Sequence, residues 1–232
     1  MAKLIELIEA AHVNSTAHGF WEGEENRDLL MKVNLLHSEL SEMLEEYRLS
    51  DEKRGGALNE IVYEWDAGRY NPHDDGAGAP PPGAKPVGFL VEAVDVAIRI
   101  YDLLGWLRTS ASGAGADRVE YATMEMYESA RELAAQWSEK RPEERRFAYA
   151  LFKAHTLATS VGDSFAAATG SAHSPQHCIS CYVAAHNALI SLLVRVERIA
   201  LLVGAGPAAF ENAVAVKMAY NQSRPMRHGK RC

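Results

Sequence analysis

Two pairs of carboxylates with the same spacing are the residues of this chain best suited to chemistry. Glu39 and Glu42 are three residues apart in the sequence. Glu92 and Asp95 repeat that spacing. On a helix, a spacing of three places both side chains on one face, close enough to share a cation. The second pair interrupts the apolar segment 89–98, where a carboxylate is costly unless it is paired or binds a metal.

A divalent cation is the partner that these carboxylates predict. Two such pairs on antiparallel helices would form a cluster of negative charge that repels itself unless a cation is present. Oxygen ligands without histidine favour Mg²⁺, or Mn²⁺, over zinc. The predicted metal ligands are Glu39, Glu42, Glu92 and Asp95. The alternative is that the first pair lies on a solvated helix face and binds nothing.

Two further carboxylates follow the first pair directly. Glu46 is four residues after Glu42 and falls on the same helical stripe, while Glu45 is three residues after Glu42. Each is a candidate to orient or deprotonate an attacking water. We therefore predict Glu45 and Glu46 as catalytic candidates, with surface exposure as the alternative for at least one of them.

Positive charge collects at the end of a chain whose net charge is −7. A chain with this much negative charge is expected to bind nucleic acid polymers poorly, because neutralising phosphates requires a basic surface. Residues 224–232 nevertheless include Arg224, Arg227, His228 and Lys230. A basic tail on an acidic body indicates a small anionic ligand. A solvated, disordered terminus is the alternative.

Three cysteines, an odd number, argue against a disulfide framework. Cys178 and Cys181 form a C-x-x-C motif with His173 and His177 just upstream. That spacing suits a tetrahedral zinc site, but a second pair of ligands is missing. A reduced, partly buried pair at the start of a helix is the other interpretation.

Helical periodicity runs through nearly the whole chain. It predicts helices at 2–13, 26–49, 89–108, 118–139, 143–168, 178–203 and 207–221. Gly and Pro mark a loop over 68–88 and a linker over 110–116, and no segment alternates as a strand would. The expected fold is therefore all-α, a helical bundle. No apolar run approaches the ~18 residues of a membrane span, so we expect a cytoplasmic protein without a membrane partner.

An internal echo suggests a tandem duplication. Segment 89–105 resembles segment 188–204 when Gly105 is aligned with Gly204. In this register Glu92 falls on Ser191 and Asp95 falls on Val194, so most carboxylates are lost from the second copy. The predicted units are residues 1–109 with the metal ligands, a degenerate second half at 110–206, and a C-terminal helix with the basic tail at 207–232. Chance similarity between two apolar helices is the alternative.

The combination of motifs resembles the all-α nucleotide pyrophosphohydrolases, the MazG-like and dimeric dUTPase-like group. Its signature is ExxE, a loop, and ExxD on a second helix. Segments 18–48 and 85–105 are similar to the two carboxylate motifs of that group, and 217–232, KMAYNQSRPMRHGKRC, is similar to its C-terminal motif. These blocks cover about a third of the chain.

The resemblance implies an enzyme that cleaves a nucleoside triphosphate to the monophosphate and pyrophosphate with Mg²⁺. It implies the four metal ligands named above, a pseudo-dimeric bundle, and a homodimer as an open quaternary alternative. Trp21 and Asn26 would lie near the base, and the phosphates or sugar would face Lys217, Asn221 and Arg224. The further substrate-binding candidates are Lys85, Arg99, Arg227, His228 and Lys230.

The chain also departs from the pattern of that group. Ser38 stands where many members carry an acidic residue, and about 110 residues separate the ExxD helix from the C-terminal motif. A catalytically inactive nucleotide-binding or interaction protein is therefore the runner-up. A di-iron oxidase is disfavoured because neither Glu39 nor Glu92 has the histidine at i+3 that such bundles use.

Overall fold

Long helices make up most of the protein, as the sequence predicts. The computed structural model describes residues 2–23, 28–49, 53, 55–65, 68–72, 79–110, 123–132, 146–169 and 175–225. The helices are α1 (Ala2–Ala17), α2 (Leu29–Arg48), α4 (Phe89–Ser110), α6 (Phe147–Thr169), α7 (Pro175–Leu202) and α8 (Pro207–Gln222), and residues 123–132 are also helical. Of the linker predicted at 110–116, Ser110 belongs to α4 and residues 111–116 lie outside the described residues.

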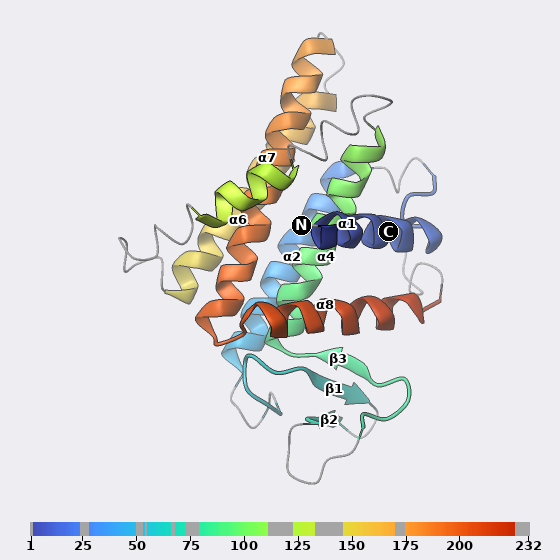
Figure 1. Cartoon of the computed structure of the whole chain (residues 1–232), viewed down its shortest axis with the longest axis vertical. Coiled ribbons are helices and arrows are strands. Elements are labelled where there is room, and N and C mark those ends of the chain that lie inside the picture. The colour runs from blue at the N-terminus through green and yellow to red at the C-terminus, as the bar shows by residue number, and fades with distance from the viewer. Residues whose placement is uncertain are drawn as a thin grey trace.

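Helix α4 is the centre of the bundle. It packs against α1, α2, α7 and α8, while α6 packs against α2 and α7. In Figure 1, α2, α4, α6 and α7 run side by side, and α1 and α8 cross them. The first eight residues of α4 show how central it is. Seven of them are at most 6% exposed, and the remaining one, Asp95, is half-buried.

Local sequence signals set the ends of the helices that carry the carboxylates. Asp28 caps α2: its side chain accepts hydrogen bonds from the backbone N–H groups of Leu30 and Met31. Gly88 precedes α4 with a φ of +105°, a conformation that favours glycine. Helix α8 begins at Pro207, where the absent N–H is not needed.

A small sheet corrects the prediction that the chain has none. Strands β1 (Val62–Trp65), β2 (Gly68–Tyr70) and β3 (Lys85–Val87) form an antiparallel sheet in the order β2-β1-β3. Both β2 and β3 lie within the segment predicted as a loop. These strands are three or four residues long, too short for alternation to stand out, and the sheet lies at one end of the bundle (Figure 1).

One described helix, residues 177–202 of α7, is long and apolar enough to cross a membrane by length and composition alone. Half of the apolar window is buried inside the protein, and α7 packs on α4, α6 and α8. Packing against three helices accounts for this composition without a membrane, since core helices of soluble proteins pass the same test.

Helices α1 and α4 approach so closely that a glycine is required between them. A Cβ atom on Gly105 would lie 2.5 Å from Cβ of His12 and 3.2 Å from the backbone oxygen of Ile8. Gly105 thus lies inside α4, five residues before the helix ends at Ser110. The close approach fixes α1 against the face of α4 that continues toward the carboxylates.

We predict that Gly105→Ala destabilises the protein by about 1–3 kcal/mol, because the added methyl group forces α1 away from α4. Urea unfolding measures the effect. Gly162→Ala is the matched control: it also lies inside a long helix, and its Cβ would meet only Val33, at 3.3 Å. Both variants gain helix propensity, so equal stabilities for the two would contradict the prediction.

Candidate functional site

A cavity of about 380 Å³ opens between α1, α2, α4 and α8. It is lined by Ala11, Asn14, Ser15, Phe20, Met31, Leu35, Ser38, Glu39, Glu42, Lys85, Glu92, Asp95, Ile98, Arg99, Asp102, Lys217, Asn221 and Arg224. All four predicted metal ligands belong to this lining. The cavity therefore brings together residues from both ends of the chain.

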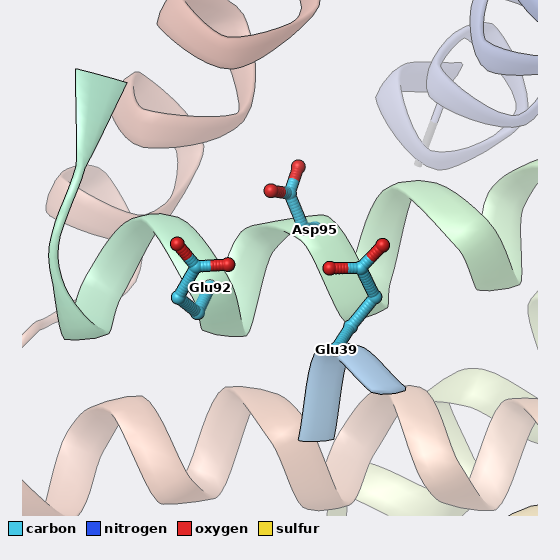
Figure 2. Close-up of side chains that lie close together, drawn as sticks. All are labelled: Glu39, Glu92 and Asp95. Carbon is cyan, nitrogen blue, oxygen red and sulfur yellow. The ribbon is translucent and has the colours of Figure 1, made fainter. Parts of the chain in front are cut away.

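Three of the four carboxylates converge at one end of the cavity. One carboxylate oxygen each from Glu39, Glu92 and Asp95 lies within 4.8 Å of the others. Figure 2 shows Glu39 approaching from α2 toward Glu92 and Asp95, which project from successive turns of α4. The i, i+3 spacing thus places the α4 pair on one face, as predicted.

Two cations, the half-buried Arg99 and the buried Lys217, compensate part of this negative charge. Arg99 donates from Nε and Nη2 to Oε1 of Glu39, at 3.1 Å each. Lys217 of α8 places Nζ 2.7 Å from Oδ2 of Asp95 and is only 4% exposed. Each cation comes from the predicted substrate-binding residues, but in this arrangement each one contacts a predicted metal ligand.

Glu92 is the carboxylate of the cluster that has no direct partner among the described residues, although the charge of Lys217 acts on it from a distance and opposes the rise of its pKa. It is 6% exposed, and no described residue forms a hydrogen bond or ion pair with it. Burial raises the pKa of Glu92 to about 8, and the nearby carboxylate of Asp95 adds to this shift. A buried acid with no protein partner and like charges beside it is a ligand position that a cation would stabilise.

The groups next to Glu92 respond to the same electrostatics. Burial raises the pKa of Asp95, and the ammonium group of Lys217 opposes that rise. For Arg99, burial acts to lower the pKa, but the carboxylates of Glu39 and Asp95 outweigh it and raise the pKa above its usual value. Arg99 therefore stays charged at neutral pH.

The donor set fits a hard divalent cation. Mg²⁺ takes oxygen ligands at about 2.1 Å, which spaces neighbouring ligand oxygens by about 3–4 Å. The oxygens of Glu39, Glu92 and Asp95 lie within 4.8 Å of one another, so small side-chain rotations bring them to that spacing. Glu42 lines the cavity but stands outside this cluster, and its Oε1 accepts a hydrogen bond from Ser38 Oγ at 3.3 Å.

The structure places the two predicted catalytic carboxylates away from the cavity lining. Glu46 accepts two hydrogen bonds from Arg69 of β2, at 2.7 and 2.9 Å, and so ties α2 to the sheet. Glu45 is an exposed residue that pairs with Arg48 at 3.3 Å. Sequence spacing could not separate these residues from Glu42, because Arg69 comes from a segment expected to be a loop.

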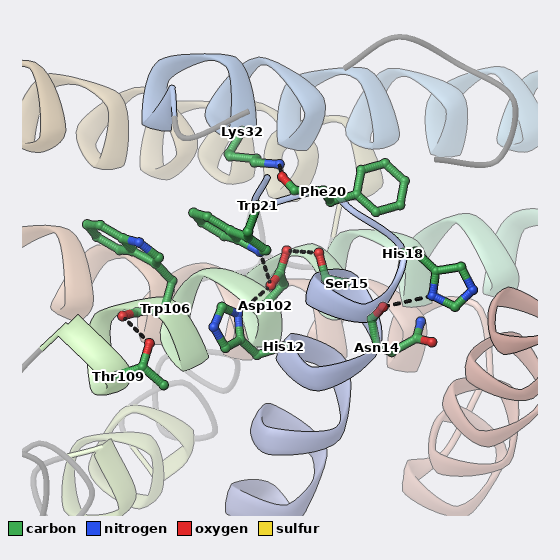
Figure 3. A network of polar contacts seen from close by, with 10 residues as sticks. All are labelled: His12, Asn14, Ser15, His18, Phe20, Trp21, Lys32, Asp102, Trp106 and Thr109. Atoms are coloured by element: carbon green, nitrogen blue, oxygen red, sulfur yellow. Dashed lines mark hydrogen bonds and ion pairs between the residues drawn. The ribbon is translucent and has the colours of Figure 1, made fainter. Parts of the chain in front are cut away.

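A polar network around Asp102 forms the other end of the cavity. Asp102 lies ten residues after Glu92 on α4, which is about 15 Å along a helix axis. His12 Nδ1 and Trp21 Nε1 each lie 2.8 Å from its Oδ1, and Ser15 Oγ donates to its Oδ2 at 2.8 Å. Figure 3 shows these side chains converging on Asp102 from α1 and the turn that follows it.

Trp21 supports the wall of the cavity and Phe20 lines it. Trp21 is 8% exposed and stacks on Trp106 with ring centroids 5.8 Å apart. The ammonium group of Lys32 lies 4.8 Å from the Trp21 ring and donates to the backbone oxygen of Phe20 at 2.6 Å (Figure 3). The aromatic residue that lines the cavity is therefore Phe20, one residue before Trp21.

The remaining predicted substrate-binding residues divide into two groups. Lys85, at the start of β3, and Asn221 and Arg224, near the end of α8, line the cavity. The backbone oxygen of Arg224 also accepts a hydrogen bond from Nε2 of His18 at 3.1 Å, which fastens this end of the chain to α1. Asn26, Arg227, His228 and Lys230 lie outside the described residues.

Sequence reasoning missed the polar and apolar residues at the Asp102 end of the cavity. These are Asn14 and Ser15 of α1, Phe20, Met31, Leu35, Ile98 and Asp102 itself. Asp102 carried a usable signal, because it is a charged residue seven positions after Asp95 in an apolar helix. The others have no pattern of their own and become visible only when α1 packs across α4.

A second cavity of the same volume, about 380 Å³, lies at the other end of α8. It is lined by Tyr127, Arg131, Val194, Glu197, Arg198, Leu201, Ala205, Pro207, Phe210 and Glu211. Tyr127 donates a hydrogen bond to Glu197, and Arg131 lies 3.6 Å from the same carboxylate. Burial raises the pKa of Glu197, although both neighbours oppose that rise.

The C-x-x-C motif lies at the N-terminal end of α7. Cys181 is buried, with Sγ 3.5 Å from Nε2 of His177, and Cys178 donates to the backbone oxygen of Ala168 at 3.4 Å. Both thiols are free. Within the described residues the two cysteines belong to no cluster of three metal-ligating groups, and His173 lies outside them.

The pKa of Glu92 predicts how stability depends on pH without metal. Between pH 4.5 and about 8 the folded protein keeps a proton that the unfolded chain has lost, so stability falls as pH rises through this window. Glu92→Gln removes this loss. We expect its stability advantage over the unchanged protein to grow with pH, by up to about 1.4 kcal/mol per pH unit.

Urea unfolding in EDTA at a series of pH values measures this difference. Glu45→Gln is the control, because Glu45 is exposed and should show the pH profile of the unchanged protein. Parallel stability profiles for Glu92→Gln and the unchanged protein would show that Glu92 is ionised in the metal-free fold at neutral pH.

Comparisons with known proteins complete the description of the site. The chain matches no protein-family model, no curated protein and no solved structure in the three comparisons made. The resemblance to the MazG-like group consequently rests on the sequence motifs quoted above, and the functional argument rests on the cavity and its residues.

Proposed function

We propose that the protein is a Mg²⁺-dependent nucleoside triphosphate pyrophosphohydrolase that releases the monophosphate and pyrophosphate. The observation that carries the proposal is the cluster of Glu39, Glu92 and Asp95, in which Glu92 is buried and forms no hydrogen bond or ion pair with any residue that the structure describes. Such a cluster beside lysines and arginines suits a substrate that brings both a divalent cation and phosphate charge.

The cations around the cavity would bind the phosphates. Lys85 lies on β3, Lys217 on α8 and Arg224 just after α8, and all three line the cavity. Arg224 offers a planar fork suited to phosphate oxygens, and Asn221 lies one helical turn after Lys217 on the same face. These residues would offset the charge that develops on the leaving pyrophosphate.

Glu42 is the cavity carboxylate best placed to act on water. A bound Mg²⁺ would polarise phosphate oxygens and lower the pKa of a bound water. Glu42 lines the cavity outside the three-carboxylate cluster, and Ser38 holds its side chain by a hydrogen bond. We therefore assign Glu42 the role of accepting the proton of the attacking water, in place of Glu45 and Glu46.

The Asp102 end of the cavity would hold the nucleoside. It lies about 15 Å from Glu92 along α4, which leaves room for the phosphate chain between the two ends. Phe20 offers an apolar ring, and Asn14 and Ser15 offer hydrogen-bonding groups. Asp102 keeps this wall in place because it binds His12, Ser15 and Trp21 together.

The finer proposal for the fold is a pseudo-dimer of two related halves, of the MazG type. Its support is a correspondence between the two cavities in the register that aligns Gly105 with Gly204. Five positions of α4 line the first cavity. Four of them, Asp95, Ile98, Arg99 and Asp102, fall on Val194, Glu197, Arg198 and Leu201, which line the second, while the fifth, Glu92, falls on Ser191, which does not. In this register the second half lacks the carboxylates of Glu92 and Asp95, which are replaced by Ser191 and Val194.

One observation favours a second candidate function, a nucleotide-binding protein without catalysis. Neither carboxylate predicted to activate water lines the cavity, and Glu42, the remaining candidate, is exposed. A binding protein would keep the metal and the phosphate contacts but would not release pyrophosphate. Product analysis separates the two functions directly.

We predict that Asp95→Asn lowers hydrolysis at least about a thousandfold while the protein stays folded, because the variant loses one metal ligand and the partner of Lys217. Pyrophosphate release from a panel of nucleoside triphosphates, with Mg²⁺ and with EDTA, measures activity. Circular dichroism checks the fold. The unchanged protein should release monophosphate and pyrophosphate in equal amounts.

Asp163→Asn is the matched control, since Asp163 is an exposed residue of α6 that does not line the cavity. It should retain full activity. Turnover of the unchanged protein that produces diphosphate and free phosphate would contradict the assigned reaction. Turnover at full rate in Asp95→Asn would contradict the assigned metal site.

A further inference from the structure

Lys217 occupies the position from which a cation would neutralise the carboxylate cluster. Its Nζ lies 2.7 Å from Oδ2 of Asp95, and its side chain is 5% exposed. Asp95 is also one of the three residues whose oxygens come within 4.8 Å of one another. The same carboxylate therefore faces a lysine ammonium group where the proposed function requires a divalent cation.

An ammonium group and a divalent cation on one carboxylate oppose each other. The ammonium group and the metal ion are both positive, and two like charges a few ångströms apart repel strongly in a buried site. A carboxylate that already pairs with the ammonium group attracts the metal ion less strongly. Lys217 is suited to leaving, because its charge sits on a flexible four-carbon stem with a single point of contact. Arg99 is held more firmly, by two hydrogen bonds to Glu39.

We propose that Lys217 is an internal counter-ion which Asp95 exchanges for the divalent cation, and that the released ammonium group then binds the phosphates of the substrate. The inference rests on the proposed function and goes beyond it. It makes phosphate binding depend on metal binding, because Lys217 is held by Asp95 until the cation arrives.

The position of Lys217 on α8 allows the second contact without a movement of the helix. Lys217, Asn221 and Arg224 line the same wall of the cavity, so an ammonium group that leaves Asp95 stays among groups facing the phosphates. Rotation about the side-chain bonds of lysine moves Nζ by several ångströms. In this scheme α8 stays packed on α4, and only the end of one side chain changes partner.

The side-chain ammonium signals of the unchanged protein test the exchange directly. A buried, hydrogen-bonded lysine exchanges protons with water slowly and gives a ¹H–¹⁵N signal from its ζ position, which a solvated lysine does not. Lys217 should give such a signal in EDTA and lose it when Mg²⁺ saturates the protein. Inorganic tripolyphosphate with Mg²⁺ should restore a signal at a different shift.

Lys32 is the matched internal control for this measurement. It is also buried, at 6% exposure, donates to the backbone oxygen of Phe20 at 2.6 Å, and is not among the residues that line the cavity. Its signal should persist unchanged through the titration. The signal that is missing from the spectrum of Lys217→Met belongs to Lys217. The signal that is missing from the spectrum of Lys32→Met belongs to Lys32.

Lys217→Met provides a second, independent measurement. Removal of the competing charge should tighten Mn²⁺ binding, measured by electron paramagnetic resonance of the free ion, at least about tenfold. It should also weaken binding of Mg²⁺–tripolyphosphate at least about tenfold. Lys32→Met should leave the Mn²⁺ affinity unchanged, although it also removes a buried ammonium group.

The outcomes separate this inference from the proposed function. If Mg²⁺ raises the melting temperature of the unchanged protein while the Lys217 signal persists, the metal site stands and the exchange is wrong. If Lys217→Met fails to fold, the spectra of the unchanged protein still decide, because Lys32→Met identifies the Lys32 signal and Lys217 is the other buried lysine among the described residues. If Mg²⁺ at millimolar concentration causes no change in stability or spectra, both the exchange and the metal-dependent function are overturned.

Discussion

Uncompensated charge on α4 is the constraint around which the rest of the site is arranged. Glu92 and Asp95 lie in the most buried stretch of the most buried helix, where an ionised carboxylate is expensive. Glu39 adds a third negative charge from α2. Two cations, Arg99 and Lys217, offset part of it. Pairing with these cations stabilises Glu39 and Asp95 in the fold, but neither cation pairs directly with Glu92.

The same charges bring distant parts of the chain together. Arg99 joins α4 to α2 through Glu39, and Lys217 joins α8 to α4 through Asp95. Asp102 adds a third connection, because it binds residues of α1 and the turn after it. Each of these contacts lies at the wall of one cavity. Polar contacts that position the helices are thus also the contacts that shape the site.

How far the sequence predicted this arrangement depended on the kind of signal available. Carboxylates in an apolar helix are conspicuous. The sequence therefore predicted both that Glu92 and Asp95 belong to the site and that they share one face of the helix. The sheet was missed because its short strands carry no alternation. Glu45 and Glu46 were predicted at the site because helical spacing shows which side of a helix a residue faces but not which residue it contacts. The contact with Arg69 holds Glu46 away from the cavity.

Completion of the site by α8 has a consequence for biosynthesis. A chain that leaves the ribosome from its N-terminus presents all the carboxylates before it presents Lys217, which lies close to the C-terminal end. Until then α4 carries buried negative charge that only Arg99 offsets. The nascent protein must therefore keep this region open, protonated or bound to a cellular cation until α8 packs against α4.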